Sequence, residues 1–176
     1  MTRWLNAANL LTFLRLVLVP FVIRAILDGH HTLALALFAA AALTDVLDGA
    51  VARRFRLATP EGAWLDPVAD KCLLSGVFLA LAGAGTVPWW LVFIIFGRDI
   101  YILAGAATVM LLTPVRKFPP SIWGKVSTLV QIVTVVAWMS GNVAEARVML
   151  WPCAAFTIWS GIHYTWRTLQ LLRDPG

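Results

Sequence analysis

Four aspartates lie within apolar stretches of the chain, at Asp45, Asp48, Asp66 and Asp70. An ionised carboxylate in a hydrocarbon environment is costly, so four of them within 26 residues require a compensating charge. Residues three or four positions apart lie on one face of a helix, so each pair directs two carboxylates to the same side. Carboxylate oxygens are ligands for Mg²⁺ and Mn²⁺, and these ions in turn bind phosphate oxygens. The pattern predicts a site for one or two such ions in an enzyme that handles phosphates.

Small residues and one arginine accompany the aspartates. Gly49 and Ala52 remove side-chain bulk one turn beyond Asp48, which lets a ligand or a helix backbone approach closely. The guanidinium of Arg53 has the planar geometry that binds a diphosphate through two hydrogen bonds. The alternative is that the aspartates are a cation or proton relay in a transporter. A transporter has no need of small residues and an arginine at fixed offsets, so the pattern favours the phosphate enzyme.

The segment from Asp45 to Asp70 reads D-x2-D-G-x2-A-R-x8-G-x3-D-x3-D. This pattern resembles the signature of the CDP-alcohol phosphatidyltransferases, and every fixed position matches. Such enzymes are usually homodimers that bind CDP-diacylglycerol and displace CMP by attack of an alcohol hydroxyl on the diacylglycerol-side phosphorus. The resemblance implies that Asp45, Asp48 and Asp66 bind the metal, and that Asp70 completes the metal site and acts as general base. It also implies a cytidine diphosphate pocket lined by Gly49, Ala52, Arg53 and Gly62.

The composition is that of an integral membrane protein. Of 176 residues, 60% are hydrophobic and 13% are charged, about half the charged fraction of a soluble domain. The chain is long enough for one domain over residues 1–176. Six apolar segments have approximately the length of a membrane span. They are Leu10–Leu27, Thr32–Val51, Pro67–Ala84, Trp89–Leu112, Ile122–Gly141 and Val148–Leu169.

Basic residues are divided unequally between the two sides of such a membrane protein. With the N-terminus in the cytoplasm, eight lie on the inner side: Arg3, Arg53, Arg54, Arg56, Arg116, Lys117, Arg167 and Arg173. Only Arg24 and Arg147 lie outside. This distribution follows the positive-inside rule, so we expect an all-α fold of six transmembrane helices with both termini cytoplasmic. The active site would lie at the inner-leaflet side of the bundle, and a bacterial inner membrane is expected.

The connections at the inner side are expected to be short. Residues 2–8 are expected to form an interfacial helix. Residues 53–61 are expected to be a cytoplasmic connection in which Pro60 and Gly62 interrupt any continuing helix.

Three polar residues in the first span share one helix face. The run Asn-x2-Thr-x2-Arg from Asn9 to Arg15 resembles the opening of the glycerol-transferring branch of the family, although Ala8 replaces its usual proline. Asn9 and Thr12 are therefore expected to bind the CDP group, and Arg15 the acceptor. The alternative for Arg15 is that its side chain extends along the helix to the inner membrane surface.

Further charges lie within the later spans. Arg98-Asp99, followed by the segment 124–131 with Lys125, is similar to phosphatidylglycerophosphate synthases and to the cardiolipin synthases of this superfamily. Arg98 and Lys125 are expected to bind an acceptor phosphate, unless one of them only pairs with Asp99. The first of these subfamilies often has a further arginine downstream, whereas residues 101–110 contain no basic residue. This difference favours phosphatidylglycerol over glycerol 3-phosphate as acceptor.

The predicted reaction is transfer of a phosphatidyl group from CDP-diacylglycerol to a glycerol-type acceptor, with release of CMP, in anionic phospholipid synthesis. Mg²⁺ or Mn²⁺ is the expected cofactor. The expected partners are the lipid bilayer and a second copy of the chain, and no nucleic acid is expected. A small divalent-cation transporter is the rival hypothesis from another class. The sequence leaves open the acceptor, the number of metal ions and the acyl-chain preference.

Overall fold

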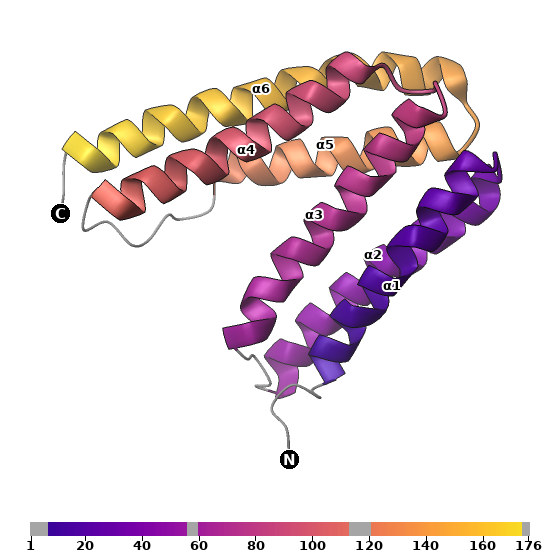
Figure 1. Cartoon of the computed structure of the whole chain (residues 1–176), viewed down its shortest axis with the longest axis horizontal. Helices are drawn as coiled ribbons and strands as arrows, with labels where there is room; N and C mark the ends of the chain where they lie inside the picture. The colour runs from indigo at the N-terminus through magenta and orange to yellow at the C-terminus, as the bar shows by residue number, and fades with distance from the viewer. Residues whose placement is uncertain (1–6, 56–59, 113–120, 174–176) are drawn as a thin grey trace. The chain divides into compact units, whose positions relative to one another are not determined.

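The computed structural model describes residues 7–55, 60–112 and 121–173, and within these ranges the secondary structure is helical (Figure 1). Side chains are described for residues 12–44, 69–109, 111 and 121–170. In chain order the helices are α1 (Ala7–Leu27), α2 (His31–Phe55), α3 (Pro60–Gly83), α4 (Trp89–Leu112), α5 (Ile122–Met139) and α6 (Val143–Arg173). The prediction of an all-α fold is confirmed for this part of the chain. The six-span topology and the cytoplasmic termini stay predictions, as does the interfacial helix, whose residues lie almost wholly outside the described ranges.

Glycines end several of the helices. Gly29, Gly85 and Gly141 follow α1, α3 and α5 and have φ angles of 75°, 73° and 82°. This left-handed conformation is favourable for glycine because it has no Cβ. After α1, the amide of Gly29 donates to the carbonyl of Ile26, and the amide of His30 donates to that of Ala25. These bonds satisfy carbonyls at the helix end and turn the chain sharply into α2.

Helices α1, α2, α3 and α6 extend further into polar sequence than the apolar segments predicted. The predicted interruption at Gly62 is wrong, because α3 begins at Pro60 and continues through Gly62. Proline is tolerated in the first turn of a helix, and an interior glycine costs only about 1 kcal/mol. Likewise α6 begins at Val143, where the Asn142 side chain accepts a hydrogen bond from the amide of Glu145. Hydropathy marks the apolar centre of a helix, whereas capping residues mark its end.

The helices form two compact units, which we describe separately. In the first unit, α1 contacts both α2 and α3. Gly76 on α3 permits this approach, because a Cβ there would lie 3.0 Å from the Ile23 side chain on α1. In the second unit, α4 contacts α6, and buried hydrogen bonds of Ser127 and Gln131 connect α5 to Thr157 on α6. The predicted single domain over residues 1–176 stays a prediction.

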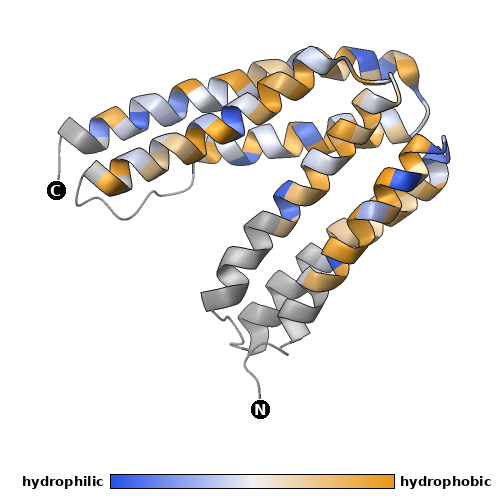
Figure 2. Ribbon diagram, viewed as in Figure 1, coloured by the Kyte–Doolittle hydropathy of each residue, from blue (hydrophilic) through white to orange (hydrophobic). Residues whose placement is uncertain are grey.

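Apolar side chains cover much of the outer surface of the second unit. Figure 2 shows hydrophobic residues along most of α4. Phe93, Leu103 and Leu111 on this helix are each more than 70% exposed. Among the described residues, Trp89–Val109 and Ile122–Met139 are long and apolar enough to cross a membrane, and His31–Thr44 is a shorter apolar stretch. Large exposed apolar surfaces are unusual on soluble monomers, so these helices indicate association with a membrane.

Candidate active site

The four aspartates of the sequence pattern lie on α2 and α3. Asp45 and Asp48 lie in the last part of α2, and Asp66 and Asp70 lie in the first part of α3. Only four residues separate the two helices, so their facing ends are at most about 18 Å apart. Both pairs of aspartates therefore lie toward the same end of the first unit, where α2 ends and α3 begins.

Of these four aspartates, only Asp70 has a described side chain. The side chains of Asp45, Asp48 and Asp66 lie outside the described residues, as do those of Arg53 and Ala52. Gly49 and Gly62 are placed only as positions within α2 and α3. No group of three metal-type ligands occurs among the side chains that are described. The metal and CDP-binding assignments of these residues stay predictions.

Asp70 forms an ion pair with Arg15. The Nη1 atom of Arg15 on α1 donates to Oδ1 of Asp70 on α3 over 2.6 Å. The Arg15 side chain is fully buried, whereas that of Asp70 is 47% exposed. A buried guanidinium is stable only where a negative charge or several acceptors compensate it. The pair thus holds one carboxylate oxygen of Asp70 in place and leaves the carboxylate accessible from outside the helix pair.

Two of the three polar residues predicted to share one face of α1, Thr12 and Arg15, are buried. Thr12 is fully buried one turn before Arg15, on the same side of the helix. Asn9 lies in α1, and its side chain lies outside the described residues. The Arg15 side chain is fully buried, and its guanidinium lies against Asp70 on α3. Its described partner is the expected general base, whereas the sequence assigned Arg15 to the acceptor.

In the second unit, Arg98 is held by its neighbour and by α6. Its Nη1 atom donates to Oδ1 of Asp99 over 2.7 Å. Its Nε atom donates to the Ser160 hydroxyl over 3.0 Å, and its Nη2 atom donates to the same hydroxyl. The Asp99 pairing is the alternative that the sequence left open for Arg98. The guanidinium nevertheless has five N–H groups, and these contacts use three of them.

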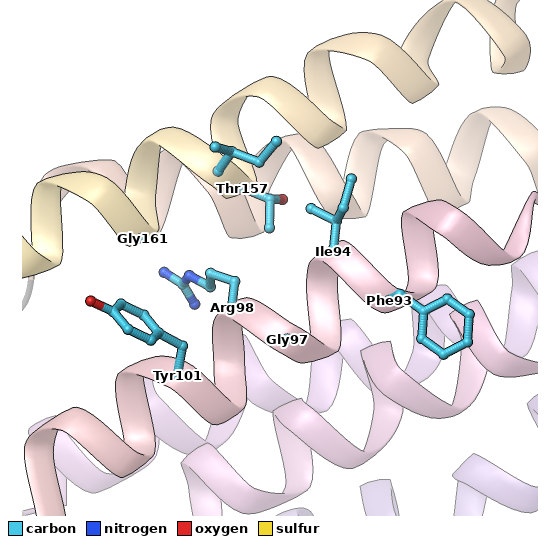
Figure 3. A pocket seen from close by; sticks show the side chains of 8 residues that line it. Phe93, Ile94, Gly97, Arg98, Tyr101, Thr157 and Gly161 are labelled. Carbon is cyan, nitrogen blue, oxygen red and sulfur yellow. The ribbon is translucent and has the colours of Figure 1, made fainter.

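A hollow of about 330 Å³ lies beside Arg98 between α4 and α6 (Figure 3). Figure 3 shows the Arg98 side chain directed toward Gly161 on α6, with Tyr101 next to it and Phe93 directed away. The Tyr101 hydroxyl lies 2.7 Å from that of Thr165, which ties α4 to α6 one turn beyond Arg98. The hollow therefore combines an apolar lining with one guanidinium.

Lys125 lies near this arrangement on α5 and is exposed. Its neighbour Gly124 faces Arg98, because a Cβ on Gly124 would lie 3.4 Å from Nη2 of Arg98. The structure thus brings the two basic segments of the acceptor prediction together within the second unit. Whether Lys125 binds an acceptor stays a prediction.

Sequence reasoning missed Ser160. A single serine in an apolar helix is usually explained by a hydrogen bond to its own backbone, and nothing in the spacing connects it to Arg98, 62 residues away. Only the packing of α4 on α6 reveals the contact.

Comparison with known proteins is consistent with the sequence pattern. The family model described as CDP-alcohol phosphatidyltransferase matches residues 5–159. A probable phosphatidylglycerophosphate synthase of Mycobacterium tuberculosis is 38% identical, over 99% of this chain and 85% of that protein. A cardiolipin synthase (CMP-forming) of Rattus norvegicus is 33% identical, over 94% of this chain and 63% of that protein. A CDP-diacylglycerol–glycerol-3-phosphate 3-phosphatidyltransferase of Haemophilus influenzae is 32% identical, over 90% of this chain and 91% of that protein.

Proposed function

This chain belongs to the CDP-alcohol phosphatidyltransferase family, and we propose that it transfers a phosphatidyl group from CDP-diacylglycerol to phosphatidylglycerol, with release of CMP. The family membership makes the chain a transferase of phospholipid synthesis and argues against the divalent-cation transporter. Enzymes of this family act on a CDP-linked donor and an alcohol acceptor, and they generally use a divalent metal ion.

The donor set fits such a metal ion. All four expected ligands, Asp45, Asp48, Asp66 and Asp70, provide hard carboxylate oxygens, and they lie on two helices whose facing ends are joined by four residues. The described carboxylate of Asp70 is half-exposed and therefore open to a ligand from solvent. Mg²⁺ or Mn²⁺, when bound, would neutralise charge that develops on the donor's diphosphate.

Asp70 is the proposed general base. As the acceptor hydroxyl oxygen forms a bond to the diacylglycerol-side phosphorus, the bond from that phosphorus to CMP breaks, and the hydroxyl proton passes to the Asp70 carboxylate. Arg15 would fix the orientation of this carboxylate, since it holds Oδ1 from a fully buried position. A fixed carboxylate promotes proton transfer through proximity. Asn9, Thr12, Gly49, Ala52, Arg53 and Gly62 would line the CDP pocket.

The environment of Arg98 is the observation that carries the choice of acceptor. Its charge is partly offset by Asp99, and residues 101–110 carry no second basic group. A single, partly compensated guanidinium fits a phosphodiester, which has one negative charge, better than a phosphomonoester, which carries nearly two at neutral pH. Phosphatidylglycerol presents a phosphodiester.

Glycerol 3-phosphate is the second candidate, because the relatives include phosphatidylglycerophosphate synthases as well as cardiolipin synthases. The M. tuberculosis relative is named a probable phosphatidylglycerophosphate synthase, and the name of the H. influenzae relative contains glycerol 3-phosphate. Exposed Lys125 would then supply the second positive charge that a phosphomonoester requires.

We place the enzyme in a bacterial inner membrane as a homodimer, with its site toward the cytoplasm. The excess of basic residues on the inner side supports this orientation. A cytoplasmic site would leave the nucleotide in water while the acyl chains stay in lipid.

The proposal is tested by measuring CMP release in lipid–detergent micelles with CDP-diacylglycerol and Mg²⁺. Phosphatidylglycerol, glycerol 3-phosphate and inositol phosphate are added separately, with EDTA and with Mn²⁺ in parallel reactions. CMP release with phosphatidylglycerol and its loss in EDTA are expected. Release with glycerol 3-phosphate alone would replace the first acceptor by the second, and release in EDTA would refute the metal requirement.

A further inference from the structure

The Ser160 hydroxyl has an unusual environment for a serine in an apolar helix. Ser160 is 1% exposed, and its oxygen accepts hydrogen bonds from both Nε and Nη2 of Arg98. Hydrogen bonds to a charged group are stronger than those between neutral groups, and a buried site strengthens them further. Ser160 thus accepts hydrogen bonds from the Nε–Nη2 edge of the guanidinium.

Two glycines, Gly161 and Gly124, lie close to the Arg98 side chain. A Cβ on Gly161 would lie 3.6 Å from Cγ of Arg98, and a Cβ on Gly124 would lie 3.4 Å from Nη2. Helices α5 and α6 therefore approach the arginine on two sides without side chains at these positions. Together with Ser160 and Asp99, they fix the side chain in one orientation.

The hydrogen bonds also determine which part of the guanidinium is left for a ligand. Ser160 occupies the Nε–Nη2 edge, and Asp99 accepts one N–H of Nη1. Within the described part of the chain, Nη1 and Nη2 each keep one further N–H group. Two N–H groups on neighbouring terminal nitrogens match two oxygens of one phosphate.

We propose that Ser160 is a positioning residue that presents the Nη1–Nη2 edge of Arg98 to a phosphate oxygen of the acceptor. This inference rests on the proposed function, because it requires an acceptor that carries a phosphate. Ser160 does not touch the acceptor and acts through the orientation of Arg98. A purely structural role would instead be to satisfy a half-buried cation, with no effect on acceptor binding.

The first test compares Ser160→Ala and Ser160→Cys with the wild-type enzyme. Cysteine keeps the shape of serine but is a weak hydrogen-bond acceptor, so the second variant separates the hydrogen bond from packing. Both variants are expected to raise the acceptor KM about tenfold, the effect of roughly one charge-assisted hydrogen bond, with kcat and the donor KM nearly unchanged. The acceptor KM is measured as mole fraction in the micelle for phosphatidylglycerol.

Ser127→Ala is the matched control. Ser127 is also 1% exposed and lies between α5 and α6, but its hydroxyl pairs with Thr157 and not with Arg98. Its loss is expected to leave the acceptor KM unchanged. An equal rise of the acceptor KM in Ser127→Ala and Ser160→Ala would overturn the proposal.

A double-mutant cycle with Arg98→Lys gives the decisive measurement. The lysine ammonium cannot offer two parallel N–H groups, so acceptor affinity falls and orientation by Ser160 loses its effect. Ser160→Ala is then expected to add little to the acceptor KM of Arg98→Lys. If Ser160→Ala raises the acceptor KM by the same factor in Arg98→Lys as in the wild-type enzyme, the positioning role is refuted. A wild-type enzyme that releases no CMP with any acceptor would refute the proposed function. This outcome differs from both the additive and the non-additive result of the cycle.

Discussion

A carboxylate that takes a proton from an alcohol must be held in place while it stays accessible. Asp70 meets both conditions, because Arg15 binds its Oδ1 and almost half of its side chain is exposed. The arginine comes from α1 and the aspartate from α3, so the contact depends on the packing of the two helices. The orientation of the Asp70 carboxylate, the proposed base, therefore depends on how α1 and α3 pack.

Replacing Asp70 by asparagine tests its role directly. Asparagine keeps the size of the side chain but cannot accept the hydroxyl proton, so kcat is expected to fall by at least about 10²-fold. CMP binding, measured by calorimetry, is expected to persist. Asp28→Asn is the matched control, because Asp28 pairs with Arg24 at the exposed end of α1 and should keep full activity. Turnover by Asp70→Asn at the wild-type rate would remove Asp70 as general base.

Two arginine–aspartate pairs allow the buried and exposed ion pairs to be compared. Arg15→Gln removes a fully buried charge that offsets Asp70 and is expected to lower the free energy of unfolding by about 2–3 kcal/mol. Arg24→Gln breaks an exposed pair and is expected to cost no more than about 1 kcal/mol. The measurement is unfolding of purified protein in one detergent. Equal losses would show that the Arg15 pair contributes no more than a surface contact.

The sequence was informative about residues whose types are unusual in their surroundings. Arg15 and Asp70 stand out as charges in apolar stretches, and both lie where a charged partner is present. Ser160 does not stand out, because serine is common in apolar helices, and its role depends on a contact across 62 residues. The same limit applies to the pairing of Arg15, whose partner was not predicted.

At the scale of helices, a buried polar layer joins α5 to α6. Gln131 is 3% exposed, and its Nε2 atom donates to Thr157 over 3.2 Å. Ser127 lies 3.3 Å from the same threonine oxygen. In a membrane, apolar packing alone discriminates poorly between helix pairings, so such hydrogen bonds contribute to the choice of register.

Gln131→Leu tests this layer. Leucine fills a similar volume without the hydrogen bonds, so a loss of about 1 kcal/mol in unfolding free energy is expected. Val133→Leu on the same helix is the control, since Val133 is 47% exposed and should have no effect. The stability of each variant is measured by thermal unfolding in detergent. A Gln131→Leu variant as stable as the wild-type enzyme would show that packing alone joins these helices.

Helix centres were predictable from hydropathy, whereas helix ends that lie in polar sequence were not. The fourth predicted segment, Trp89–Leu112, coincides with α4 because apolar sequence continues to both ends. In contrast, α3 begins seven residues before Pro67, in polar sequence that carries Glu61 and Asp66. Asp66 is a proposed metal ligand, so hydropathy underestimates the length of the helix where the proposed site lies.

At the scale of the whole molecule, the proposed chemistry requires a defined orientation in the membrane. The turn between α1 and α2 and the C-terminal end of α6 are on opposite sides in the six-span topology, because one lies after the first span and the other after the sixth. The basic residues predict that the turn faces outward and the C-terminal end inward. An enzyme that uses a cytidine nucleotide needs its site on the side where that nucleotide is available.

Labelling of single cysteines tests this orientation. In a variant with Cys72→Ser and Cys153→Ala, His30→Cys places a thiol in the exposed α1–α2 turn, and Gln170→Cys places one on an exposed position near the end of α6. A membrane-impermeant maleimide is expected to label His30→Cys in intact spheroplasts, and Gln170→Cys only after permeabilisation. Retained CMP release in each variant ensures that the folded enzyme is being labelled. The reverse pattern would invert the topology. Labelling of both positions in intact spheroplasts would contradict the odd number of spans that the six-span topology puts between His30 and Gln170. Asp45, Asp48 and Gly49 lie in the last part of α2, away from the α1–α2 turn. The same result therefore also tells on which side of the membrane the proposed reaction takes place.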